Sequence, residues 1–140
     1  MAVHALTVLA YKDGDRVTSG FLADSVNTNP VVIRRLFLAL QDAKLVETRK
    51  GAGFGSRLSR SPARISLAEI FRAVEDHEQF IMPPRKPNQD CPVGHCIQAE
   101  LAKVFSAARE ALVEELGRTT LADILNEVKS CCHNGDGKKH

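Results

Sequence analysis

The chain has 140 residues, of which 44% are hydrophobic and 26% are charged, and this composition is ordinary for one soluble globular domain with one core. No apolar run is long enough to span a membrane, and residues 1–10 lack the basic start and the cleavage site of a signal peptide, so we expect a cytoplasmic protein without a membrane partner. The net charge of +2 is unevenly spread: residues 34–64 hold eight basic and two acidic side chains, whereas residues 66–128 hold six basic and eleven acidic ones. This asymmetry is typical of a protein whose basic part meets a polyanion, although a solvated basic face would carry the same charges.

Three helices are expected in the first third of the chain. Residues 2–11 place apolar side chains along one side of a helix, and residues 12–15 form a turn. Thr18 or Ser19 can cap a short second helix that runs to about Val26. Asn29 and Pro30 suit the start of a third helix, because the Asn side chain accepts a bond from a free backbone N–H and proline has no N–H to leave unpaired. The third helix runs to about residue 43, and its predicted buried stripe is Ile33, Leu36, Phe37 and Leu40.

A short β-hairpin is expected next. Residues 45–48 have strand character, residues 50–55 are rich in glycine, and Arg57 begins a return strand. The predicted fold class is therefore mainly α with a small β-hairpin.

The second half of the chain is predicted to be helical. Ser66 and Glu69 form a capping box that opens a helix over the following residues. A proline-rich loop at residues 77–91 precedes a long helix that starts near Pro92 and ends at Gly117. A second capping box at residues 120–123 opens a short helix to about residue 129, and residues 131–140 are expected to form a flexible tail.

Apolar residues recur every three or four positions along the predicted long helix, over about three heptads. A stripe of this length predicts a dimer, because a partner helix would bury it. The predicted dimer-interface residues are Ile97, Leu101, Val104, Phe105, Ala108, Leu112 and Leu116.

The order of helix, short helix, three-residue turn, helix and hairpin is the layout of a winged helix-turn-helix. In this geometry the second helix of the motif enters the major groove of DNA, and its first turn reaches the base edges. Arginine suits phosphate oxygens or the O6 and N7 atoms of guanine, and valine suits the methyl group of thymine. The predicted DNA-binding residues on the two helices are Ser19, Val31, Val32, Arg34 and Arg35.

The hairpin is expected to act as the wing of this motif. Glycines allow the chain to approach a DNA backbone closely, and basic side chains beside them suit phosphates or a minor groove. The predicted DNA-binding residues of the wing are Arg49, Lys50, Gly51, Gly53 and Arg57.

Several stretches in one order carry a family resemblance. They are residues 24–35 (DSVNTNPVVIRR), 51–58 (GAGFGSRL), 65–70 (ISLAEI), 73–75 (AVE) and 91–94 (CPVG). Together they resemble the Rrf2 family of winged helix-turn-helix transcription regulators, which includes IscR, NsrR and CymR, and its YwnA-like branch in particular. The resemblance covers nearly the whole chain.

This resemblance implies a winged-helix domain at residues 1–76 and dimerisation helices at residues 92–130. It also implies a homodimer that binds a palindromic operator in double-stranded DNA, usually as a repressor. The family's recognition positions fall on Asn29, Val31, Val32, Arg34 and Arg35, and its wing positions fall on Lys50, Gly51, Gly53 and Arg57. The chain departs from the family's Gly-Pro-Gly-Gly-Gly-Tyr wing by having Ala52, Phe54 and Ser56 at three of those positions.

The cysteines leave three interpretations open. Cluster-binding members of the family have three cysteines before the long helix, whereas this chain has only Cys91 and Cys96 there. With His95 these could supply three ligands to an iron–sulfur cluster or zinc, and residues 131–133 a fourth, but C-x4-C is not a standard zinc spacing and we expect no metal cofactor. Alternatively, Cys96 near the helix start is a redox-sensing thiol with Cys91 as its resolving partner, or it packs as a small hydrophobe.

Two other classes of protein are alternatives to a DNA-binding regulator. An enzyme is not expected, because the sequence has no nucleophile elbow, no HExxH motif and no P-loop lysine after the glycine-rich turn. A winged helix that binds a protein instead of DNA would show the same pattern of elements. Salt-dependent binding to duplex DNA would distinguish a DNA-binding winged helix from a protein-binding one, because phosphate contacts release counterions.

Overall fold

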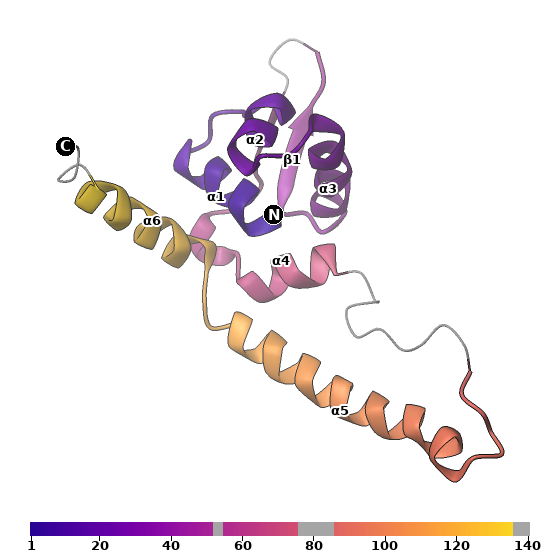
Figure 1. The fold of residues 1–140 in the computed structure, drawn as a ribbon. Coiled ribbons are helices and arrows are strands. Elements are labelled where there is room, and N and C mark those ends of the chain that lie inside the picture. Colours follow the sequence, from indigo (N-terminus) through magenta and orange to yellow (C-terminus); the bar gives the residue numbers. More distant parts are fainter. Residues whose placement is uncertain (52–54, 76–85, 136–140) are drawn as a thin grey trace.

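The computed structural model describes residues 1–51, 55–75 and 86–135, and Figure 1 shows their arrangement. The elements are α1 (Ala2–Tyr11), α2 (Ser19–Val26), α3 (Pro30–Asp42), β1 (Val46–Arg49), β2 (Gly55–Leu58), the 3-10 helix η1 (Pro62–Arg64), α4 (Leu67–Val74), α5 (Pro92–Leu116) and α6 (Leu121–Gly135). This largely helical structure with one antiparallel hairpin confirms the predicted fold class. Helices α1–α4 and the hairpin form a compact unit, from which α5 extends (Figure 1). Within the described ranges, none of the helices combines the length and the apolarity needed to cross a membrane.

Side-chain caps set the starts of the two helices of the motif. The Thr18 hydroxyl accepts a hydrogen bond from the backbone N–H of Phe21 at 3.1 Å, so Thr18 and not Ser19 caps α2. The Asn29 side chain accepts from the backbone N–H of Val32 at 3.1 Å, and Pro30 takes the first position of α3, as predicted. Between these helices Asn27 has a left-handed backbone (φ 64°), which ends α2 and turns the chain toward α3.

The core lies between α1, α3, α4 and the hairpin. Three of the four predicted stripe residues of α3, namely Ile33, Phe37 and Leu40, are buried, whereas Leu36 is half-buried at its edge. The largest fully buried side chains are Leu6, Leu9, Leu22, Ile33, Leu40, Leu45, Ile65, Ile70 and Leu121. Burial of a Leu or Ile side chain contributes about 1.5–3 kcal/mol, so this cluster holds α3 and the hairpin in fixed relative positions.

Helix α6 packs against this core. Leu121 and Leu125 are buried against it, and backbone bonds join Leu121 N–H to Ile65 O (2.8 Å) and Leu67 N–H to Thr119 O (2.9 Å). The predicted capping box at residues 120–123 is present with both of its hydrogen bonds. The prediction of a flexible tail from residue 131 is wrong for residues 131–135, because α6 continues to Gly135.

A third segment extends the hairpin into a small sheet. Val17 pairs with Ser56 through two backbone hydrogen bonds of 2.8 and 2.9 Å, on the edge of β2 that β1 does not occupy. This close approach requires glycine at position 55, which has φ +125° and whose added Cβ would lie 2.9 Å from the carbonyl oxygen of Val17. The chain before α2 is thereby fastened to the base of the wing.

Gly55→Ala is expected to destabilise the fold by about 2–3 kcal/mol, because a strained positive φ and a backbone clash coincide at that position. Gly51→Ala is the matched control: its φ is +83°, but its added Cβ would meet nothing within 4 Å, so the loss should be smaller. Urea unfolding of the two variants measures the difference. Equal losses would show that the contact with Val17 contributes nothing beyond the backbone strain.

Candidate nucleic-acid interface

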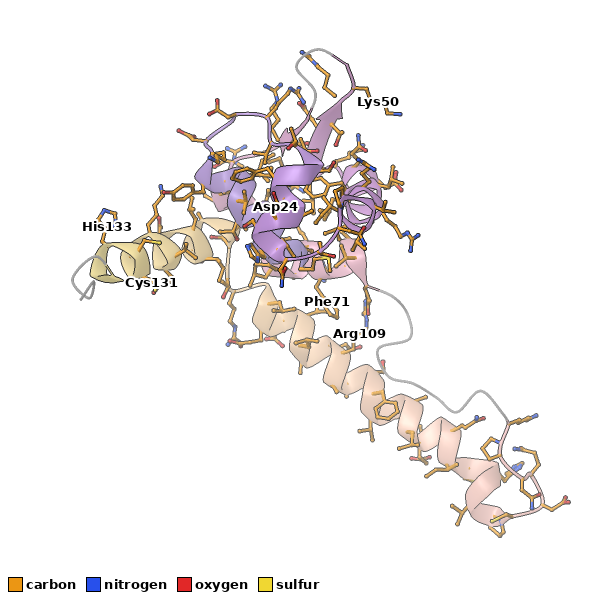
Figure 2. All side chains as sticks on the ribbon, turned by 45° about the horizontal axis from the view of Figure 1, so that its top comes forward. Asp24, Lys50, Phe71, Arg109, Cys131 and His133 are labelled. Atoms are coloured by element: carbon orange, nitrogen blue, oxygen red, sulfur yellow. The ribbon has the colours of Figure 1, made fainter. Side chains whose placement is uncertain are left out.

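A groove of about 490 Å³ separates the exposed side of α3 from the hairpin. Of the predicted DNA-binding residues, six line this groove: Ser19, Arg34, Arg35, Arg49, Lys50 and Gly51. They come from α2, α3 and the hairpin, which are brought together only by the fold. Figure 2 places Lys50 at the end of the hairpin, on the side of the compact unit opposite α5.

The first turns of α3 present the exposed side chains that a recognition helix needs. Val31 is 58% exposed, and Arg34 and Arg35 are both exposed on the same open side. Val32 is half-buried, and the Asn29 carbonyl oxygen is engaged as the helix cap. Asn29, Val31 and Val32 lie outside the residues that line the groove, so they belong to the open surface of α3.

The basic residues of the hairpin do not all border the groove. In the register of the ladder Arg49 lies opposite Gly55 and Glu47 opposite Arg57, and the last two form a salt bridge of 3.1 Å. Arg57 does not line the groove next to α3. The predicted wing residue Gly53 lies outside the described residues.

Sequence reasoning missed Arg16, which the fold places beside the wing. Arg16 precedes α2 and donates a hydrogen bond to the carbonyl oxygen of Gly55 at 3.2 Å. Partial desolvation lowers the pKa of its guanidinium, and the positive charges of Arg57 and Arg49 lower it further, while Glu47 acts in the opposite direction. No local pattern could have revealed this position, because it depends on the pairing of Val17 with Ser56.

Within the described residues, the apolar stripe of helix α5 is only partly covered. None of its 25 residues is buried, and Val104 is 62% exposed, Leu112 38% and Ile97 37%. The helix contacts α4, and its Arg109 donates two hydrogen bonds of 2.5 Å to the carboxylate of Glu75, just beyond that helix. This pairing raises the pKa of Arg109.

The cysteines of the described chain are exposed free thiols. Cys91 is the N-cap residue of α5, whereas Cys96 lies beyond its first turn and so beyond the free N–H groups of the helix start. In the described ranges, His, Cys, Asp and Glu side chains nowhere gather in threes that could hold a metal ion. Cys131 and His133 lie at the far end of α6 (Figure 2).

Comparison with known proteins agrees with the winged-helix geometry. The HTH-type transcriptional regulator YwnA of Bacillus subtilis is 38% identical over 128 residues, which cover 91% of this chain and 94% of YwnA. A solved structure described as a DNA-binding protein is 37% identical, covers 89% of this chain and 95% of its own, and superposes with a TM-score of 0.69. The IscR structure of T. potens shares the fold, with a TM-score of 0.66, 23% identity, and coverage of 93% and 84% of the two chains.

The match to a family extends over nine-tenths of the chain. Residues 1–127 match Rrf2, described as an iron-dependent transcriptional regulator. This span contains α1–α5, the hairpin and the buried first half of α6. The chain therefore belongs to the Rrf2 family of transcriptional regulators.

Proposed function

We propose that this protein is a sequence-specific DNA-binding repressor of the cytoplasm, not an enzyme, and that it acts as a homodimer on a palindromic operator. The observation that carries the proposal is the groove between α3 and the hairpin, which arginine and lysine side chains line from both sides. A helix that projects into a major groove and a hairpin that follows the adjacent minor groove have one sugar–phosphate strand between them. A basic groove between these two elements suits that strand.

The open side of α3 supplies direct readout of bases. Arg34 and Arg35 are exposed, and a guanidinium can donate two parallel hydrogen bonds to a guanine edge. Val31 lies one turn earlier on the exposed surface, where a branched apolar side chain suits a thymine methyl. Phosphate contacts from the hairpin hold the protein in register while these side chains discriminate between sequences.

The stripe on α5 supports the homodimer. Its apolar side chains repeat at helical spacing over 20 residues, from Ile97 to Leu116, and the described part of the chain buries none of them fully. A second copy of α5 would bury this stripe, and two-fold symmetry would then present two α3 helices to two half-sites.

Selection of bound sequences from a random duplex pool tests the proposal. We expect a palindromic consensus with half-site centres about one helical turn, or a multiple of it, apart. The affinity for the selected duplex should fall steeply between about 50 and 200 mM salt because of counterion release. Failure to enrich any sequence, together with capture of the chain by a protein partner, would identify a protein-interaction module.

Thiol oxidation is expected to change operator affinity about 5- to 150-fold, the usual range of coupling between two sites. Cys91 and Cys96 are separated by five helical steps, about 7.5 Å along the axis, which exceeds the roughly 7 Å that a disulfide spans between Cα atoms. Oxidation by diamide, which accepts the two thiol hydrogens, would join the two sulfur atoms in a disulfide. This bond therefore requires the first turn of α5 to unwind. That turn packs closely on the preceding loop, since an added Cβ on Gly94 would lie 2.2 Å from Asn88 O.

The measurement is an operator titration with reduced and diamide-treated protein in a background lacking Cys131 and Cys132, whose exposed thiols would also react. Cys96→Ser and Cys91→Ser serve as controls that cannot form the bond. Equal affinity of the reduced and oxidised forms would assign both thiols to a structural role.

A further inference from the structure

The three-segment sheet at the base of the wing has two faces with different chemistry. Side chains alternate between the faces of a strand, so the pairings Thr48–Ser56 and Ser56–Val17 place these residues on one side, here the inner face. Thr48 and Ser56 line the groove with α3, and their hydroxyl oxygens are 2.9 Å apart. Val17 and Ser56 are buried, so the inner face is directed at the protein.

The neighbouring positions form the opposite side of the sheet, here the outer face. Arg16 precedes Val17, Arg57 follows Ser56, and Glu47 lies opposite Arg57. By the same alternation, Arg49 at the end of β1 belongs to the outer face. Arg49 also borders the groove, so the two faces meet at this residue. Three arginines against one glutamate leave a net charge of +2 on the outer face (3 − 1).

The contacts within the outer face leave positive charge unneutralised. Glu47 pairs with Arg57, and both side chains are about half exposed. Arg16 is held near them by its bond to Gly55 O, and its pKa is lowered there by desolvation and then by the charges of Arg57 and Arg49. Positive charges held close together on a small surface repel one another, and an anion that bridges them relieves this repulsion.

The DNA geometry identifies this anion. A hairpin that follows a minor groove has a sugar–phosphate strand along each of its sides, because the groove is bounded by both strands and is only about 6 Å wide. The strand next to α3 meets the inner side of the hairpin and the groove already described. The other strand, here the far strand, lies beside the outer face.

We propose that the outer face is a second phosphate-binding surface, on which Arg16 contacts the far strand of the minor groove together with Arg49 and Arg57. This inference rests on the proposed function and adds a site that is independent of base readout by α3. Arg16 contributes a contact from outside the helix-turn-helix and the hairpin, through the segment that Val17 fastens to β2.

The first test measures the salt dependence of binding to a duplex selected from a random pool. Each lost phosphate contact should reduce the slope of log affinity against log salt by about 0.9, which corresponds to roughly fivefold in affinity at 0.15 M relative to 1 M salt. In a dimer, Arg16→Gln should therefore lower the slope by about 1.8 and the affinity by roughly 30-fold. Arg118→Gln removes the same charge just after the C-terminal end of α5, outside the groove and the outer face, and is expected to leave both values unchanged.

Two further variants separate a phosphate contact from a structural role of Arg16. Arg16→Lys keeps the positive charge and should retain most of the affinity. Glu47→Gln removes the carboxylate of the outer face, so it should strengthen binding and steepen the salt dependence.

The second test places neutral methylphosphonate linkages in one strand of the minor groove at a time. The Arg16→Gln defect should disappear on duplexes whose far strand is neutral and persist when the other strand is neutral. The inference is overturned if Arg16→Gln binds the unmodified duplex like the wild type, if Arg16→Lys loses as much affinity as Arg16→Gln, or if the defect persists on the neutral far strand. A wild-type protein that binds no duplex would instead refute the proposed function.

Discussion

Val104→Glu is expected to convert the protein into a monomer and to reduce its affinity for a palindromic operator by more than 100-fold. Val104 is the most exposed of the large side chains on the α5 stripe, at 62%, so the fold of one chain does not depend on it. In a dimer the substitution would bury two unpaired carboxylates, each at a cost of about 3–5 kcal/mol. Each 1.4 kcal/mol changes a dissociation constant tenfold, so the two copies together should prevent assembly at micromolar concentration.

Sedimentation velocity measures the change of mass, and thermal unfolding in dilute solution checks that the chain still folds. Ser106→Glu is the matched control, because Ser106 lies on the opposite side of the same helix and is exposed. The control should remain dimeric and bind the operator normally. A dimeric Val104→Glu variant would place the dimer interface on another surface.

Arg34→Ala and Arg35→Ala should each lower specific DNA affinity about 5- to 150-fold per half-site, with the effect applied twice in a dimer. A bidentate contact between arginine and guanine is worth about 1–3 kcal/mol of discrimination against the wrong base. Both side chains are exposed and border the groove beside the hairpin, so their truncation leaves the core packing unchanged.

The measurement compares the selected duplex with duplexes in which single base pairs are changed. Loss of a base contact should relax the preference at one position of each half-site, whereas loss of a phosphate contact weakens binding to all sequences alike. Arg118→Ala serves as the control for overall charge. Unchanged affinity and unchanged base preference in both α3 variants would show that α3 is not the recognition helix.

Much of the fold could be predicted because local chemistry defines its elements. Asn29 and Pro30 begin α3, the Ser66 cap begins α4, and the capping box at Thr120 begins α6, as their side-chain hydrogen bonds with nearby backbone predict. The apolar repeat of α3 likewise predicted its buried face, because helical periodicity depends only on neighbours along the chain.

The extent of α6 was the main local error. Residues 131–135 are polar and include glycine at the end, a composition typical of a tail, yet they continue the helix. The burial of Leu121 and Leu125 against α1 anchors the first turns, and propagation of an established helix adds one hydrogen bond per residue. Tertiary contacts, which composition does not reveal, therefore compensate for the unfavourable nucleation of helix α6.

The sequence by itself determined the helix starts, the hairpin, the basic segment and the family. Tertiary structure alone decided which basic residues share a surface. The pairing of Val17 with Ser56 joins positions 39 residues apart and brings Arg16 within 3.2 Å of Gly55 O, beside Arg49 and Arg57. Such a contact is set by the packing of α1, α2 and the hairpin around one core, since neither partner has a local preference for the other.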